Sequence, residues 1–295
     1  MTTSVSHKAR VWGQTLRPRT LPAAVGPVLL GQTLVAPGHF AWPTALLCLA
    51  CALALQLAVN LANDLFDGLA GVDQPDRLGP TRALQAGWLG AGELKVGLVV
   101  TLGLAVATGL WLVLFGHWLL WLLGGLALLG VLGYSGGKRP YANRGLGEVA
   151  VWAFFGPVAV LGCLLAQQSP ITREAVAAGL LMGMPVAAIL VVNNLRDRHT
   201  DARAGKITLA VRIGPCATRW LFAMLTAGPL VVTLPPGAPF WTWLVWGGAG
   251  LAALGLVREM RCRDGAALNA LLGMTALYSL LVALWLWVRL VVVGP

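Results

Sequence analysis

Two segments of the sequence, far apart in the chain, gather amide and carboxylate side chains at helical spacing. At 100° per residue, the groups of each segment fall within about a third of a helix circumference. The residues concerned are Asn63, Asp64, Asp67, Asn193, Asp197 and Asp201. Neighbouring carboxylates repel one another unless a cation lies between them. Mg²⁺ prefers oxygen ligands and is usually held by carboxylates together with substrate phosphates. The spacing therefore predicts a Mg²⁺ site shared by the two segments.

Basic side chains accompany both acidic segments. Those nearest in the sequence are Arg77, Arg82, Lys138, Arg139, Arg196, Lys206 and Arg212. Carboxylates for a metal, combined with Lys and Arg for an anion, are typical of a diphosphate site. A simpler explanation is that these charges are solvated helix ends. That explanation suits Arg198, Arg203, Asp73 and Asp76 better than the acids within the apolar runs, where ionisable groups are costly.

The two acidic segments also repeat each other. One constant shift along the chain relates Asn63 and Asp67 to Asn193 and Asp197, and it relates Arg82 to Arg212. We interpret this as a weak internal duplication, with its first motif over residues 60–82 and its second over residues 193–214. The whole chain, residues 1–295, is then expected to be a single domain whose site lies where the two halves meet.

The composition indicates which elements must position these groups. Hydrophobic residues make up 58% of the chain and charged residues only 11%, against about 25% charged in soluble domains. A chain this apolar belongs in a lipid bilayer. Its net charge is +10, but the basic residues are spread over several segments without a continuous stripe, so a nucleic-acid partner is not expected.

Nine apolar stretches are long enough to be membrane spans, at about 20 residues each. Their ranges are 20–36, 42–66, 94–115, 117–134, 149–166, 174–194, 217–234, 240–257 and 267–291. The runs are continuous rather than alternating, which favours an all-α polytopic membrane bundle of nine transmembrane helices over a β-barrel.

The basic residues indicate how such a bundle is oriented. All except Arg173 and Arg289 fall in the N-terminal tail or in loops after even-numbered spans. The positive-inside rule then places the N-terminus, the cap loops and the acidic site in the cytoplasm, and the C-terminus outside. We therefore expect an integral protein of a bacterial cytoplasmic (inner) membrane.

Three longer blocks resemble the cytoplasmic motifs of the UbiA superfamily of intramembrane aromatic prenyltransferases. They read NDLFD with GVDQPDRLGPTRA, YSGGKRPYANRGLGEVAVWAFFG and NNLRDRHTDARAGKITLAVRIG. The likeness runs from Arg17 to at least Gly214 and is strongest to the branch that prenylates 1,4-dihydroxy-2-naphthoate in menaquinone synthesis. The resemblance implies a helical bundle with a central cavity, Mg²⁺ bound by two Asp-rich motifs, and a cap of cytoplasmic loops.

The family's first motif, NDxxDxxxD, matches this chain incompletely. Asn63, Asp64 and Asp67 stand at its first three polar positions, but Gly71 occupies the last acidic one. Asp73 is the nearest substitute. The resemblance therefore implies that Asn63, Asp64 and Asp67 are metal ligands, with Asp73 as a candidate fourth.

The second motif matches in full at Asn193, Asp197 and Asp201, and a YxxxK element matches Tyr134 and Lys138. By resemblance, the second motif supplies the remaining metal ligands. The implied contacts to the diphosphate are Tyr134, Lys138, Arg139, Arg77, Arg82 and Lys206. The residues expected to be catalytic are Asp67, Asp197, Asp201 and Lys138.

The implied reaction transfers a polyprenyl group from polyprenyl diphosphate to 1,4-dihydroxy-2-naphthoate, with loss of diphosphate and CO₂, and gives demethylmenaquinol. Positive charge must neutralise the departing diphosphate. An allylic cation also needs a dry wall, for which π-faces are suitable. Candidate aromatic residues are Phe66, Trp152, Phe154 and Phe155. The prenyl tail would lie among the spans, where each buried CH₂ is worth about 0.8 kcal/mol.

Two alternatives remain open. A sibling prenyltransferase acting on 4-hydroxybenzoate, homogentisate or a chlorophyll-type acceptor would have the same diphosphate machinery. A secondary transporter would instead need ionisable groups near the bilayer centre, with broken helices on both sides. The polar clusters here all fall towards one side, which disfavours transport.

Overall fold

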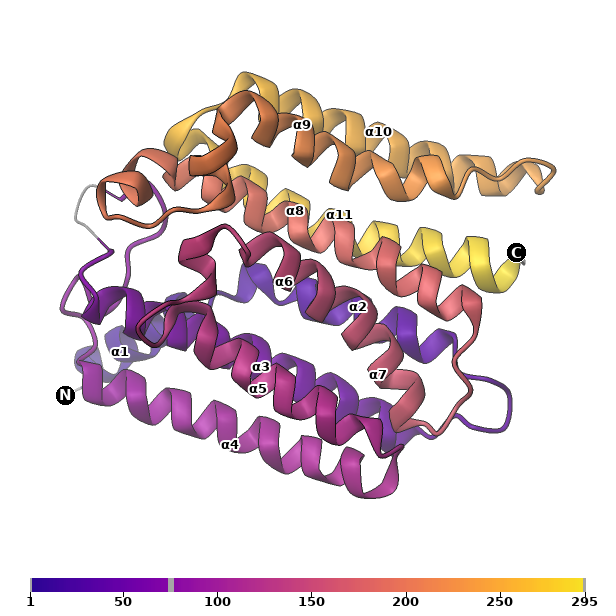
Figure 1. Cartoon of the computed structure of the whole chain (residues 1–295), viewed down its shortest axis with the longest axis horizontal. Helices are drawn as coiled ribbons and strands as arrows, with labels where there is room; N and C mark the ends of the chain where they lie inside the picture. The colour runs from indigo at the N-terminus through magenta and orange to yellow at the C-terminus, as the bar shows by residue number, and fades with distance from the viewer. Residues whose placement is uncertain (1, 74–76, 294–295) are drawn as a thin grey trace.

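The computed structural model describes residues 2–73 and 77–293, and every regular element within these ranges is helical. The helices run side by side in one bundle, with the two chain ends at opposite ends of it (Figure 1). The α-helices are α1 (Thr2–Thr15), α2 (Pro22–Thr33), α3 (Trp42–Leu69), α4 (Ala91–Phe115), α5 (Leu119–Ser135), α6 (Gly147–Ala153), α7 (Ala159–Ala166), α8 (Arg173–Arg203), α9 (Leu209–Val232), α10 (Phe240–Cys262) and α11 (Asn269–Trp287). The predicted all-α class is confirmed.

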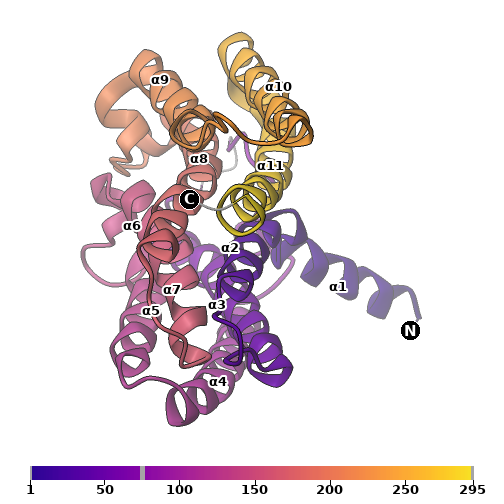
Figure 2. The same cartoon turned by 90° about the vertical axis from the view of Figure 1, so that its right-hand side faces the viewer.

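Short helical turns complete the chain between these elements. The 3₁₀ turns are η1 (Pro18–Thr20), η2 (Tyr141–Arg144) and η4 (Gly265–Leu268), and the π-helical turns are η3 (Phe154–Val158) and η5 (Val288–Val292). Helix α1 precedes the bundle and projects away from it (Figure 2).

Seven helical segments within the described ranges are long and apolar enough to cross a membrane. All nine predicted stretches are helical, but α5 has 17 residues and α2 only 12, so these two fall short of that length. Many large apolar side chains on α4 and α5 face outwards, among them Val99, Trp111 and Trp121. An outward surface of this kind suits lipid rather than water, and the chain is an integral membrane protein.

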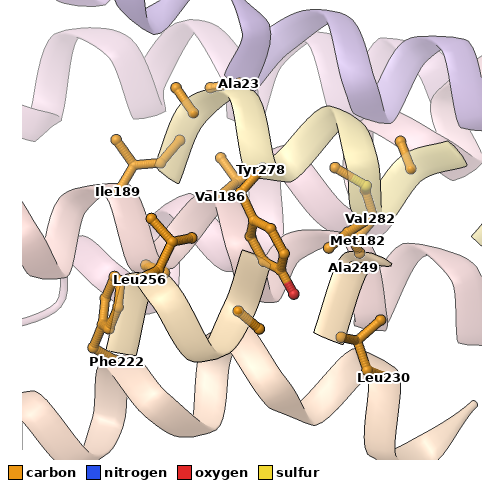
Figure 3. Close-up of a cluster of buried hydrophobic side chains, with 14 of the residues drawn as sticks. Ala23, Met182, Val186, Ile189, Phe222, Leu230, Ala249, Leu256, Tyr278 and Val282 are labelled. Carbon is orange, nitrogen blue, oxygen red and sulfur yellow. The ribbon is translucent and has the colours of Figure 1, made fainter. Parts of the chain in front are cut away.

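The largest apolar core lies where α8 packs with α2, α9, α10 and α11 (Figure 3). Met182, Val186 and Ile189 of α8 contribute to it, together with Tyr278 of α11. The Tyr278 hydroxyl donates a hydrogen bond to the Thr226 carbonyl oxygen at 2.7 Å. A polar group among apolar helices needs such a partner, because no water is available to it there.

A π-helical turn separates α6 from α7 and brings this segment very close to α8. Pro157 lies within this turn and has no amide hydrogen to donate to the helix. A Cβ on Gly156 would lie 2.5 Å from the Gly179 carbonyl oxygen and 2.8 Å from the Gly183 Cα. Only glycine permits this approach, which fixes the two aromatic residues that precede Gly156.

Helices α3 and α8 carry the predicted acidic segments to the same end of the bundle (Figure 1). Helix α3 continues to Leu69 and α8 to Arg203, so each extends beyond its predicted apolar span. Helix α9 begins at Leu209, earlier than the predicted residue 217, and kinks at Gly214 just before Pro215. The polar faces of α3 and α8 are therefore helical throughout, as their spacing predicted.

Candidate active site

The last turns of α3 hold two almost fully buried carboxylates with different partners. Asp64 accepts hydrogen bonds from the backbone N–H groups of Ala83 at 3.1 Å and Leu84 at 3.3 Å. Asp67 accepts instead from the Lys206 Nζ at 2.9 Å. Asp64 thus fastens the loop that follows α3, while Asp67 faces the loop after α8. Its role as a metal ligand stays a prediction.

Lys206 links the two acidic segments. It follows α8 in the sequence, pairs directly with Asp67 of α3, and also interacts electrostatically with Asp201 of α8. Burial disfavours the charged amine, but the carboxylates of Asp67 and Asp201 outweigh this effect and raise the pKa of Lys206 above its ordinary value. Lys206 therefore carries a full positive charge between the two helices.

Arg77 makes a second link of the same kind. Its Nη2 lies 3.0 Å from Asp197 Oδ2, and its Nη1 forms an ion pair with Asp73. Arg82 Nε lies 3.4 Å from the second oxygen of Asp73. Burial lowers the pKa of Arg77, but Asp197 and Asp73 outweigh it, so the pKa lies above its ordinary value. Asp73 thus belongs to the charged cluster although it lies beyond α3.

Arg196 is buried and holds the second segment in place. Its Nε and Nη2 donate to Asp197 at 2.8 and 2.6 Å, and Nη2 also donates to Asn193 Oδ1 at 2.7 Å. Its Nη1 donates to Asn269 Oδ1 at 2.9 Å, and Asn269 in turn donates to the Leu78 carbonyl oxygen at 2.9 Å. Helix α11 therefore supports the site through Asn269, a residue without any sequence signal.

The charges of the cluster alternate, with basic side chains placed between carboxylates. Within residues 2–73 and 77–293, no group of three or more carboxylate, His or Cys side chains gathers as a ready metal centre. The acids instead meet through Arg77 and Lys206, because like charges this close need a cation between them. The donor set is carboxylate and amide oxygen, which fits a hard cation such as Mg²⁺. Asp76 lies outside the described residues.

A cavity of about 330 Å³ lies between the helices and reaches both acidic segments, at Asn63 and Asn193. Its polar lining includes Asn63, Asn193, Tyr134 and Arg17. Most of the remaining lining is apolar, including Val28, Leu112, Leu123, Ala127 and Val158. The cavity therefore joins a polar end to an apolar interior, as an amphiphilic substrate requires.

Two of the four predicted aromatic residues line this cavity. Phe154 and Phe155 belong to the π-helical turn and face the cavity. Trp152 lies outside its lining, and its Nε1 donates to the Leu180 carbonyl oxygen at 2.9 Å. Phe66 lines a neighbouring pocket instead.

That neighbouring pocket has a volume of about 390 Å³, and both Lys138 and Asp67 line it. Ser135 also lines it and donates to Asn63 Oδ1 at 3.1 Å, which connects it to the main cavity. Lys138 is exposed at its rim. Arg139 is exposed too and lies outside the lining of both pockets, so the structure does not bring it to the cluster.

The fold and the site together define a helical membrane protein in which a cluster of paired charges lies close to a cavity with a polar end and an apolar interior. A family model described as the UbiA prenyltransferase family matches residues 24–271. The chain belongs to this family, which confirms the resemblance seen in its motifs.

Relatives of this chain carry a more specific name. The chain is 41% identical over 254 residues to a 1,4-dihydroxy-2-naphthoate octaprenyltransferase of Mycobacterium tuberculosis, covering 85% of this chain and 87% of the relative. It is 36% identical over 296 residues to the Escherichia coli protein of the same name, covering 95% of each.

Solved structures share the fold. A UbiA homologue from Archaeoglobus fulgidus bound to GPP and Mg²⁺ superposes with a TM-score of 0.62 at 16% identity, covering 95% of this chain and 99% of the homologue. At that identity the likeness concerns the fold alone.

Proposed function

We propose that this protein transfers a polyprenyl group from polyprenyl diphosphate to 1,4-dihydroxy-2-naphthoate, with loss of diphosphate and CO₂. The observation that carries the proposal is that basic side chains cross between the two acidic segments. Lys206, which follows α8, pairs with Asp67 of α3, and Arg77, which follows α3, pairs with Asp197 of α8. The cluster lies beside a cavity with an apolar interior. The names of the relatives, which agree on this acceptor, support the choice of dihydroxynaphthoate.

Mg²⁺ is the metal that we assign to the cluster. The residues that would hold it are Asn63, Asp64, Asp67, Asp73, Asn193, Asp197 and Asp201. When bound, the metal supplies Lewis-acid neutralisation of the leaving diphosphate. The all-oxygen donor set supports the assignment, as does the A. fulgidus homologue solved with GPP and Mg²⁺.

The basic residues of this chain bind and neutralise the diphosphate. Arg77 and Lys206 are paired with carboxylates in this structure, and their charged groups would also donate hydrogen bonds to phosphate oxygens. Lys138 reaches the head group from the rim of the second pocket, and Tyr134 from the main cavity. Arg82 supports the cluster through Asp73. Arg139 is exposed and outside both pockets, so we assign it no contact with the diphosphate.

The cavity wall protects the reacting carbon from water. Phe154 and Phe155 present π-faces to an allylic group whose diphosphate lies at the polar end. The prenyl tail extends among apolar side chains such as Leu112 and Leu123. This arrangement keeps the electrophile dry until the electron-rich ring attacks it.

We further infer that the chain is one domain of nine membrane crossings in a bacterial inner membrane, with the N-terminus and the site cytoplasmic. The chain ends lie at opposite ends of the bundle, which agrees with an odd number of crossings (Figure 1). The concentration of basic residues at the end that carries the site supports this orientation.

The experiment that tests the function incubates purified protein with Mg²⁺, one labelled polyprenyl diphosphate and a panel of aromatic acids. We expect a prenylated product from 1,4-dihydroxy-2-naphthoate whose mass lacks CO₂. Turnover of 4-hydroxybenzoate or homogentisate in its place would identify a sibling prenyltransferase. A protein that consumes no prenyl diphosphate with any acceptor would refute the proposal.

A further inference from the structure

Arg17 lines the polar end of the main cavity, and its side chain makes no direct ion pair with the described residues of the charged cluster. It lies between α1 and η1, with φ 53° and ψ 63°, in the left-handed region. Its Nη2 is buried and has no hydrogen-bond partner among the described residues. A buried guanidinium nitrogen without a partner is costly, so this position calls for an incoming acceptor of hydrogen bonds.

Hydrogen bonds to the carbonyl oxygens of Leu16 and Arg17 fix the backbone at this position. Thr20 donates to the Arg17 carbonyl oxygen through its backbone N–H and through Oγ1, each at 2.9 Å. Asn60 of α3 donates to the Leu16 carbonyl oxygen at 3.0 Å. A left-handed conformation is unfavourable for arginine and persists only where its surroundings enforce it. The local structure thus orients this side chain before any ligand arrives.

No carboxylate of the described residues pairs directly with Arg17, although Asp64, Asp73 and Asp67 act on it electrostatically. Within the described part of the chain it makes no ion pair, and the carboxylates nearby are bound elsewhere. Asp67 pairs with Lys206, Asp73 with Arg77, and Asp64 with backbone amides. Burial and the like charge of Arg77 lower the pKa of Arg17 to about 10, which still leaves it charged at neutral pH. The position therefore suits an anion.

The proposed reaction brings two anionic groups into the cavity, the diphosphate and the carboxylate of the acceptor. The diphosphate already has cations at Arg77, Lys206 and Lys138. Arg17 interacts electrostatically with Arg77 and with Asp64, Asp73 and Asp67 but pairs directly with none of them. In the cavity lining it is accompanied by the neutral hydrogen-bonding side chains of Thr20, Gln56 and Asn60. Gln56 Nε2 donates to Thr20 Oγ1 at 3.2 Å, which ties this wall together. A planar guanidinium with an unpartnered nitrogen, beside neutral hydrogen-bonding groups in the cavity lining, matches a planar aromatic carboxylate in shape and charge.

On the basis of the proposed function, we propose that Arg17 is a specificity-determining residue that binds the carboxylate of the aromatic acceptor. During the reaction the bond between the ring carbon and the carboxylate breaks, and its electron pair returns to the ring as CO₂ leaves. The product therefore lacks the group that Arg17 holds, which favours product release. The carboxylate is still attached to the ring while the ring attacks the prenyl group, so the contact is made equally in the bound acceptor and during that attack. It therefore acts on acceptor binding rather than on prenyl transfer itself.

The test compares Arg17→Gly with wild type, because glycine adopts the left-handed conformation without strain and keeps the local fold. We expect the KM for 1,4-dihydroxy-2-naphthoate to rise about 10- to 100-fold, with the KM for polyprenyl diphosphate within about twofold of wild type. Arg17→Lys should recover part of the affinity. The matched control is Arg19→Gly, which removes an exposed arginine two residues away and should change neither KM.

Two further ligands distinguish a wrong assignment of Arg17 from a wrong proposed function. 1,4-Dihydroxynaphthalene lacks the carboxylate, so wild type and Arg17→Gly should show the same KM for it. Binding of 2-naphthoate, which has the carboxylate but no hydroxyl groups, should weaken in Arg17→Gly by the same factor as the KM. If wild type turns over dihydroxynaphthoate and Arg17→Gly has an unchanged KM, the Arg17 assignment is wrong. A rise in the KM for polyprenyl diphosphate would place Arg17 at the diphosphate and also overturn it. Absence of wild-type turnover contradicts the proposed function instead.

Discussion

Replacing Asp201 with asparagine removes one negative charge from the cluster and leaves the size of the side chain almost unchanged. Asp201 is 9% exposed and interacts electrostatically with Lys206, while the direct partner of Lys206 is Asp67. Asp197 keeps its contacts to Arg77 and Arg196 in this variant. We therefore expect the free energy of unfolding to change by no more than about 1 kcal/mol.

The same substitution should have a large effect on the reaction. A unit charge about 4 Å from an ion is worth about 4 kcal/mol at an effective dielectric constant near 20. If Asp201 helps to hold the cation that neutralises the leaving diphosphate, its loss slows transfer by about 10³-fold. The prediction is therefore a folded protein with very low turnover.

The assay measures the initial rate of prenylated product and thermal unfolding in the same detergent. Asp264→Asn is the matched control, because the Asp264 side chain is 69% exposed and pairs with Arg219, away from the cavity lining. This control should keep the wild-type rate. The reasoning is refuted if Asp201→Asn retains more than about a tenth of the wild-type rate, or if it loses its fold.

Two further substitutions and one treatment test neighbouring parts of the account. Asp64→Asn removes a charged acceptor of two backbone hydrogen bonds, so thermal unfolding should report a loss of about 1–3 kcal/mol; unchanged stability would contradict the role of Asp64 in fastening the loop. Asp197→Asn leaves the buried guanidinium of Arg196 without its carboxylate and should cost about 3–5 kcal/mol, more than Asp201→Asn; the reverse order would be inconsistent with the contacts. Chelation with EDTA should stop prenyl transfer and added Mg²⁺ should restore it, whereas activity that survives chelation would exclude a metal-dependent mechanism.

Much of the fold followed from the sequence, because long apolar runs leave few alternatives in a membrane. The polar faces of α3 and α8 were predicted from helical periodicity, which fixes where Asp67, Asp197 and Asp201 point. The predicted apolar span over 217–234 leaves out the first turns of α9, because it was selected by apolar length, whereas the helix begins at Leu209 and includes Arg212 and a kink at Gly214.

Which side chains pair within the site depends on contacts between different elements, and helical periodicity does not predict such contacts. Nothing local indicates that Lys206 reaches Asp67 or that Asn269 supports Arg196, since each partner lies on a different element. Arg17 was grouped with the basic N-terminal tail, because only its left-handed backbone and the approach of Asn60 turn it into the cavity. These features arise from packing between helices, which spacing along one helix does not encode.

The central claim is that α3 and α8 together form one metal–diphosphate site. The most direct measurement is the equilibrium binding of a labelled prenyl diphosphate, with and without Mg²⁺, to wild type, Asp67→Asn and Asp201→Asn. We predict that Mg²⁺ strengthens binding to wild type and that each single variant, on either helix, loses most of this Mg²⁺-dependent gain. A full Mg²⁺-dependent gain in either variant would contradict a site shared by the two helices.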